Sequence, residues 1–137
     1  MLDQKTLTIL EFDKIRDLVA AYAGFSGGRE LALAMQPTTE IEQAQEWQAE
    51  TREAVSLLES DSAATIGGAR DVRRAADNAL RGFTLPAEDF LAIQATIIAA
   101  RNLRRQLLRL EDRVPHLAAI AMLIEERRGL VSATPST

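Results

Sequence analysis

The hydrophobic positions of this chain recur every three or four residues over most of its length, which is the spacing of amphipathic α-helices. The pattern is clear in the first 23 residues, where one side of the predicted helix carries Phe12, Ile15, Leu18, Val19 and Tyr22. We expect that side to be buried, with Leu7, Ile9 and Leu10 packing on the same core as a lead-in turn. Gly24 ends this element, because glycine commonly follows the last turn of a helix.

Proline and capping residues mark the ends of the remaining helices. The second runs from Ser26 to Pro37, with Leu31, Leu33 and Met35 available for burial. Two glycines in its first turn, Gly27 and Gly28, suggest that another backbone passes close by. The third helix starts at a Thr39–Glu42 capping box and runs for about twenty residues to Glu59 or Ser60. A short helix follows at 71–80.

The fourth long helix is predicted over Pro86–Glu111, and a last one over Pro115–Arg128. In the last helix the residues expected to be buried are Leu117, Ile120, Met122, Leu123 and Ile124. The sequence therefore predicts an all-α fold, an elongated bundle of five to six helices with long third and fourth helices. We expect residues 1–128 to form one helical domain. Residues 129–137 lack periodicity and look like a flexible, truncated tail of a larger multidomain protein.

Composition supports the helical prediction and excludes several kinds of chemistry. Ala and Leu, the residues that favour helices most, dominate the apolar positions. The chain has no Cys and a single His, so thiol nucleophiles, zinc–thiolate sites and paired imidazoles are excluded. The absence of a signal peptide or a long apolar run argues against a membrane. We expect a reduced, cytoplasmic setting.

Charge is distributed unevenly along the chain, whose formal net charge is −4. Residues 1–69 hold 5 basic and 12 acidic side chains, a net charge of −7, with six glutamates in or beside the third helix. Residues 70–137 hold 11 basic and 8 acidic side chains, a net charge of +3. On the fourth helix Arg101, Arg105 and Arg109 recur every four residues and so share a face. We name Arg101, Arg104, Arg105 and Arg109 as candidate nucleic-acid contacts, because arginine forks match phosphate oxygens in pairs. The alternative is that they face the acidic third helix or water.

The other candidates for chemistry are weaker. Glycines 67 and 68, beside Arg70, Arg73 and Arg74, could form a phosphate-binding nest or a plain loop. His116 follows Pro115, in a position typical of surface or capping roles. Trp47 fits a packing anchor better than a base-stacking platform. The G-x-x-x-x-G-K-[ST] loop that binds nucleotides is absent from the sequence. We expect no catalytic, metal or cofactor residue in this chain.

A series of short sequence motifs resembles the extreme N-terminus of the second bacterial subfamily of MutS-like proteins, and the motifs occur in the same order as in that family. Leu10–Ile15 reads "leu-glu-phe-asp-lys-ile", and a glycine-led helix runs from Gly28 to Pro37. A Thr-x-Glu-Ala phrase covers 51–54, and a Gly-Gly-x-x-Asp-Val-Arg phrase covers 67–73. The helix opening at 85–90 completes the series, and the resemblance covers roughly residues 2–108. The chain departs from the pattern at Arg74 and Ala75, where the family often has a proline.

The resemblance implies a helical core or lever region that begins directly at the N-terminus. It also implies a parent protein with a helical clamp, an ATPase domain that uses ATP and Mg²⁺, and a C-terminal nuclease domain. Such proteins are homodimers associated with binding of branched DNA, suppression of homologous recombination and, in some bacteria, splitting of stalled ribosomes. None of their ATP-binding or nuclease motifs falls in these 137 residues.

Three functions follow as hypotheses. The first is a rigid helical lever that joins the ATPase to the clamp, with the remaining domains of the same chain as its partners. The second is a module that binds DNA or ribosomal RNA directly through Arg101–Arg109. The third is a self-association module that pairs through an apolar helix stripe.

Overall fold

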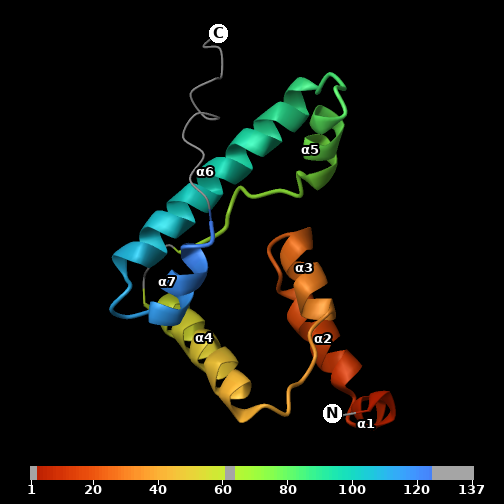
Figure 1. Cartoon of the computed structure of the whole chain (residues 1–137), viewed down its shortest axis with the longest axis vertical. Helices are drawn as coiled ribbons and strands as arrows, with labels where there is room; N and C mark the ends of the chain where they lie inside the picture. The colour runs from red at the N-terminus through yellow and green to blue at the C-terminus, as the bar shows by residue number, and fades with distance from the viewer. Residues whose placement is uncertain (1–2, 61–63, 125–137) are drawn as a thin grey trace. The chain divides into compact units, whose positions relative to one another are not determined.

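Residues 3–60 and 64–124 are described by the computed structural model, and all of their regular structure is helical (Figure 1). Seven helices lie in these ranges: α1 (Gln4–Ile9), α2 (Phe12–Ala21), α3 (Ser26–Leu33), α4 (Ile41–Glu59), α5 (Arg73–Leu80), α6 (Ala87–Arg109) and α7 (Pro115–Ala121). The all-α prediction is confirmed, and so are the two long helices, α4 with 19 residues and α6 with 23. The chain divides into two compact units, residues 1–49 and 50–137, and α4 runs through the boundary.

The prediction of five to six helices was too low because the first element is two helices. Asp3 caps α1, its carboxylate accepting a hydrogen bond from Thr6 N at 2.7 Å. The break comes at Glu11, which has a left-handed backbone with φ of 56°. A left-handed residue cannot continue a right-handed helix, so α2 starts afresh at Phe12. The third predicted helix also begins later than expected, at Ile41, and it is the Thr38 hydroxyl that accepts from Glu40 N at 3.1 Å.

In the first unit α2 and α3 pack against each other as a helical hairpin (Figure 1). Its buried residues are few, with Leu7 of α1 at 4% exposure and Ala20 of α2 at 2%. The expectation that the apolar side of α2 is buried was wrong for Ile15, Leu18, Val19 and Tyr22, and likewise for Leu31 of α3, because all five are exposed. Helical periodicity identifies an apolar face, but it does not say whether a neighbour covers it.

A neighbouring side chain, and not the expected second backbone, lies close to the glycines at the start of α3, Gly27 and Gly28. A Cβ at Gly27 would come within 2.9 Å of the Phe25 ring, so the aromatic side chain folds over this glycine. A Cβ at Gly28 would meet only Ala23 Cβ, at an ordinary 3.7 Å. The predicted close approach of a second backbone was therefore wrong, since a neighbouring side chain occupies the space.

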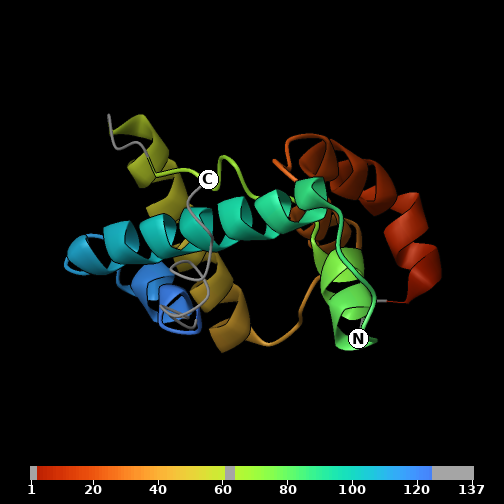
Figure 2. The same cartoon turned by 90° about the horizontal axis from the view of Figure 1, so that it is seen from above.

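In the second unit α6 is the central rod, with α5 beside its N-terminal part and α7 beside its C-terminal part (Figures 1 and 2). The segment before α5 is fastened to α6 by Thr96, whose hydroxyl accepts from Arg70 N at 3.0 Å and lies 2.8 Å from Ala92 O. At about 1.5 Å per residue, α6 is roughly 35 Å long.

The core of this unit lies where α4, α6 and α7 meet. It consists of Leu57, Leu107, Val114 and Ala121, with partly buried leucines such as Leu103 and Leu117 packed around it. Val114 and Ala121 are almost fully enclosed, at 2% and 0% exposure. Small side chains let the short α7 approach α6 closely, as Ala118 at 2% exposure also shows.

The last helix is shorter than predicted. It ends at Ala121, and residues 122–123 form a turn, so the helix expected as far as Arg128 was wrong for this stretch. Ile120, Met122 and Leu123 are exposed, against expectation, because the buried side of α7 is formed by Ala118 and Ala121. Residues 125–128 and the predicted tail at 129–137 lie outside the described ranges.

A single carboxylate joins α4 to the start of α7. Oε2 of Glu53 accepts a hydrogen bond from Leu117 N at 2.9 Å, and Oε1 accepts one from His116 N at 3.1 Å. Nδ1 of the His116 ring lies 2.6 Å from Oε1 and donates to it when it carries the proton. The N-cap residue is Val114, whose side chain has no oxygen to offer, and Pro115 has no N–H. Glu53 therefore caps α7 from another helix.

The same contacts control the ionisation of this side chain, of which only 12% is exposed. Burial raises the pKa of the Glu53 carboxyl, whereas the hydrogen bonds from Leu117 and His116 and the charge of His116 lower it. The lowering effects win, so the pKa of Glu53 lies below its ordinary value of 4.5.

Replacing Glu53 should destabilise the chain, whereas replacing a neighbouring glutamate should not. Glu53→Ala leaves two backbone donors of α7 without their acceptor, and we expect the free energy of unfolding to fall by about 1–3 kcal/mol. Glu59→Ala removes an exposed carboxylate from the same helix and should change it by less than about 0.5 kcal/mol. Urea denaturation followed by circular dichroism measures both, and equal stability of the two variants would rule out the cap.

The contribution of Glu53 should depend on pH in a defined direction. Because the pKa is lower in the folded chain than in the unfolded one, the stabilisation is fully present above about pH 4.5 and is lost as pH falls through the folded-state value. The difference in unfolding free energy between the wild type and Glu53→Gln should therefore narrow below pH 4.5. A difference that stays constant from pH 7 to pH 3 would contradict this assignment.

Candidate functional site

The four arginines named as candidate contacts lie on the C-terminal half of α6. We call Arg101, Arg104, Arg105 and Arg109 the Arg face. Arg105 and Arg109 are exposed, while Arg101 and Arg104 are half-buried. On a helix of 3.6 residues per turn these four positions fall within about 140° of the circumference. The structure thus places the four side chains on one side of one helix, as their spacing predicts.

Three of these side chains have no ion-pair partner among the residues that the structure describes. Within residues 3–60 and 64–124, Arg101, Arg105 and Arg109 form no ion pair with a carboxylate. The Nε of Arg101 is buried and has no hydrogen-bond acceptor there. The alternative expectation was that the row faces the acidic third helix or water. No ion pair joins these three residues to that helix within the described ranges, whereas the exposure of Arg105 and Arg109 agrees with a water-facing position.

The charges of α6 also follow the direction of the helix dipole. Glu88 and Asp89 occupy its first turn and Arg109 its last, so each charge lies near the helix end that attracts it. Part of the reason for arginines at the C-terminal end is therefore structural. This effect covers only the last turn and does not account for Arg101.

The glycine pair between α4 and α5 does not form a phosphate nest. Residues 66–69 make a turn in which Ala69 N donates to Ile66 O at 3.0 Å, with Gly68 at a φ of 90°. The N–H of Gly67 already donates to the Thr65 hydroxyl at 2.9 Å. Of the arginines near it, Arg73 is held by both oxygens of Asp71. The plain-loop alternative describes this segment.

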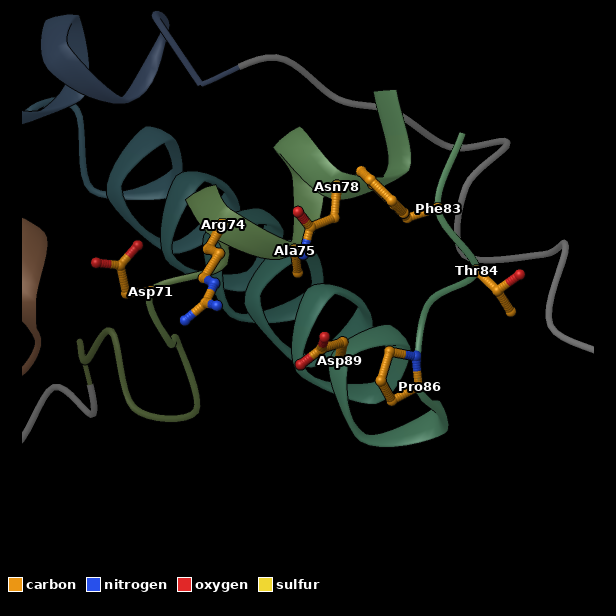
Figure 3. Close-up of a pocket in the computed structure, with 8 residues that line it drawn as sticks. All are labelled: Asp71, Arg74, Ala75, Asn78, Phe83, Thr84, Pro86 and Asp89. Carbon is orange, nitrogen blue, oxygen red and sulfur yellow. The ribbon is translucent and has the colours of Figure 1, made fainter. Parts of the chain in front are cut away.

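A hollow of roughly 590 Å³ lies between α5 and the start of α6 (Figure 3). It is bordered by Arg74 and Asn78 of α5, by Phe83 of the connecting loop and by Asp89 of α6. Gly82, with a φ of 80°, ends α5 and lets Phe83 N donate back to Asn78 O at 3.0 Å, which fixes the loop at the rim. The lining mixes both charges, Asp71 and Asp89 with Arg74, with apolar surface.

Trp47 is half-exposed, at 44%, and so is not the buried anchor that its spacing favoured. It borders a hollow together with Glu40, Glu42 and Glu46. These carboxylates would repel a phosphate backbone, which argues against base stacking on this indole.

The part of the chain that the structure describes contains neither a metal-binding cluster nor a membrane-spanning helix. No group of three His, Asp or Glu side chains there is placed to hold a metal ion. No helix in the same ranges is both long and apolar enough to cross a membrane.

The residue that sequence reasoning missed is Glu53. It lies among other glutamates on α4, and the charge pattern alone does not distinguish a capping carboxylate from a solvated one. His116 was assigned to a surface or capping role, and the structure places it at the cap itself. A signal was present in the sequence, because a helix that opens with Val-Pro-His has no local side chain to cap it.

Comparison with known proteins gives one consistent result. The chain is 39% identical over 127 residues to the endonuclease MutS2 of Thermomicrobium roseum, a match that covers 90% of this chain and 16% of that protein. It is 35% identical over 123 residues to the endonuclease MutS2 of Symbiobacterium thermophilum, covering 90% of the chain and 15% of the relative. The match to the endonuclease MutS2 of Pelotomaculum thermopropionicum is 32% over 136 residues, covering 96% and 17%.

No protein-family model and no solved structure matches the chain. The chain spans about one sixth of the length of these curated relatives. Their similarity nevertheless extends over about nine tenths of the chain itself and agrees with the phrases found in the sequence. These residues are therefore a MutS2-like segment, and the resemblance to the second bacterial MutS-like subfamily is confirmed.

Proposed function

We propose that this segment is a helical lever that transmits movement between parts of a larger MutS2-like protein and performs no chemistry itself. The relatives are named endonucleases, so the parent protein would be an enzyme whose reactive groups lie outside this segment. In this proposal the parent binds ATP with Mg²⁺ and works as a homodimer on branched DNA to suppress homologous recombination, with stalled ribosomes as a second target.

The observation that carries the lever proposal is the construction of the second unit. The 23-residue α6 is supported by α5 near its start and by α7 near its end. Glu53 then ties α7 to α4 through hydrogen bonds to the helix backbone. Packed helices of this kind move between discrete arrangements and do not bend gradually, which is what a lever requires.

A chimaera tests the lever in a complete protein. This chain would replace the matching 127-residue segment of the Thermomicrobium roseum MutS2, and ATP hydrolysis would be measured with and without branched DNA. We expect the chimaera to hydrolyse ATP, and we expect branched DNA to stimulate this hydrolysis. Deleting the segment should leave nucleotide binding intact but remove the stimulation.

Two proline variants of the chimaera separate stiffness from folding. Ala100→Pro breaks the middle of α6 at a cost of about 3 kcal/mol, whereas Ala87→Pro falls at the first helical position, where proline is tolerated. Only Ala100→Pro should lose the coupling, with a fluorescent nucleotide confirming that ATP still binds. DNA-stimulated hydrolysis by the deleted protein, or by Ala100→Pro, would overturn the lever.

A second candidate function, self-association, is favoured by the apolar side of the hairpin in the first unit. Tyr22 is 90% exposed, Leu31 76% and Leu18 65%. Large exposed apolar side chains that form one patch commonly mark a contact surface.

Sedimentation velocity of the chain at several concentrations tests this candidate. If the hairpin pairs between chains, the sedimentation coefficient rises with concentration, and Leu18→Glu/Leu31→Glu abolishes the rise. Arg29→Glu, an exposed change on α3, serves as the control. A coefficient independent of concentration removes self-association.

A further inference from the structure

The Arg face stands out from the rest of α6 because its charge is uncompensated along the helix. Between Asp89 in the first turn and Glu111 beyond the last, the sequence contains no carboxylate and four arginines. The four arginines lie within nine consecutive residues, 101–109. Glu111 and Asp112 follow directly, so the basic stretch ends at Arg109.

Three other arginines of the chain pair with a carboxylate that is close to them in the sequence. Arg16 pairs with Asp13, Arg73 with Asp71, and Arg81 with Asp77 at 3.1 Å, each within four residues along the chain. Arg101 and Arg105 have no carboxylate within four residues along the chain. Glu111 and Asp112 follow Arg109 closely, yet none of the three arginines forms an ion pair within residues 3–60 and 64–124.

Arg101 adds a second, independent observation. Its Nε is buried and lacks an acceptor among the described residues. A buried donor that finds no acceptor costs free energy, and a charged one costs more than a neutral one. The buried Nε lies out of reach of an external ligand, so an anion at this face would contact the outer guanidinium nitrogens of Arg101.

The spacing of the row limits the chemistry of that anion. Arg101, Arg105 and Arg109 follow one another at intervals of about 6 Å along the helix, so the ligand carries several acceptors in series. The face has no aromatic side chain, since the one aromatic of α6 is Phe90 in the first turn, which leaves nothing on which bases could stack. A backbone of repeated phosphates meets both conditions, because phosphates accept paired bonds from guanidinium groups.

We propose that the Arg face binds the phosphodiester backbone of a nucleic acid, without reading its sequence. The site lies on this segment itself and stands whether or not the segment acts as a lever. A carboxylate-rich protein is the competing occupant, and the repeated spacing of unpaired arginines favours the polyphosphate.

The test is a fluorescence-anisotropy titration of the 137-residue chain at several salt concentrations. The probes are labelled duplex DNA, single-stranded DNA and single-stranded RNA, each in two unrelated sequences. The logarithm of the binding constant should fall linearly with the logarithm of the salt concentration. The two sequences of each probe should bind with equal affinity. The three probes distinguish DNA from RNA as the source of the phosphate backbone.

A matched pair of double variants locates the site. Arg105→Gln/Arg109→Gln should lower affinity at low salt about tenfold or more and reduce the salt slope by about two. Arg73→Gln/Arg81→Gln changes the net charge equally but removes arginines that are already paired on α5, and it should bind like the wild type. Circular dichroism confirms that both variants keep their helix content.

Three results would overturn the proposal. The first is absence of binding at low salt to all three probes, and the second is an equal loss of affinity in the two double variants. The third is binding of polyglutamate as tight as binding of the nucleic acids, which would assign the face to an acidic protein. None of these results bears on the coupling measured in the chimaera.

Discussion

The second unit of this chain depends on one half-buried carboxylate. Glu53 supplies the acceptors that the start of α7 lacks, because Val114 and Pro115 cannot supply them. The same bonds place α7 where its small side chains reach Leu57 of α4 and Leu107 of α6. Without that capping interaction, a seven-residue helix has little intrinsic stability, since isolated helices of that length are marginal in water.

This constraint explains how so small a core can order three helices. Only four residues make up the buried cluster, and two of them are Val and Ala. The hydrogen bonds of Glu53 act at one side of the cluster, and Thr96 fastens the segment before α5 further along α6. Polar contacts at defined points thus complement the apolar contacts that hold the unit together, and these contacts are the physical basis of the lever proposal.

The sequence predicted the helices well because their signals are local. Pro86 and Pro115 mark helix starts, and the apolar spacing of α4 and α6 extends over many turns. Burial could not be predicted in the same way, as Tyr22 and Leu31 show, because it depends on what lies opposite each face. The break at Glu11 was also missed, since a left-handed glutamate has no distinctive sequence signal. In the candidate site, the spacing of the arginines predicted that they share one side of α6. The lack of ion pairs at Arg101, Arg105 and Arg109 among the described residues could be seen only in the coordinates.

The central claim is that Glu53 caps α7, and hydrogen exchange at two backbone amides tests it most directly. In the wild type the N–H groups of His116 and Leu117 should exchange slowly, although amides in the first turn of a helix normally have no intrahelical acceptor. In Glu53→Gln they should exchange about tenfold faster or more, while amides in the middle of α6 keep their protection. Equal exchange at both amides in the two proteins would contradict the account.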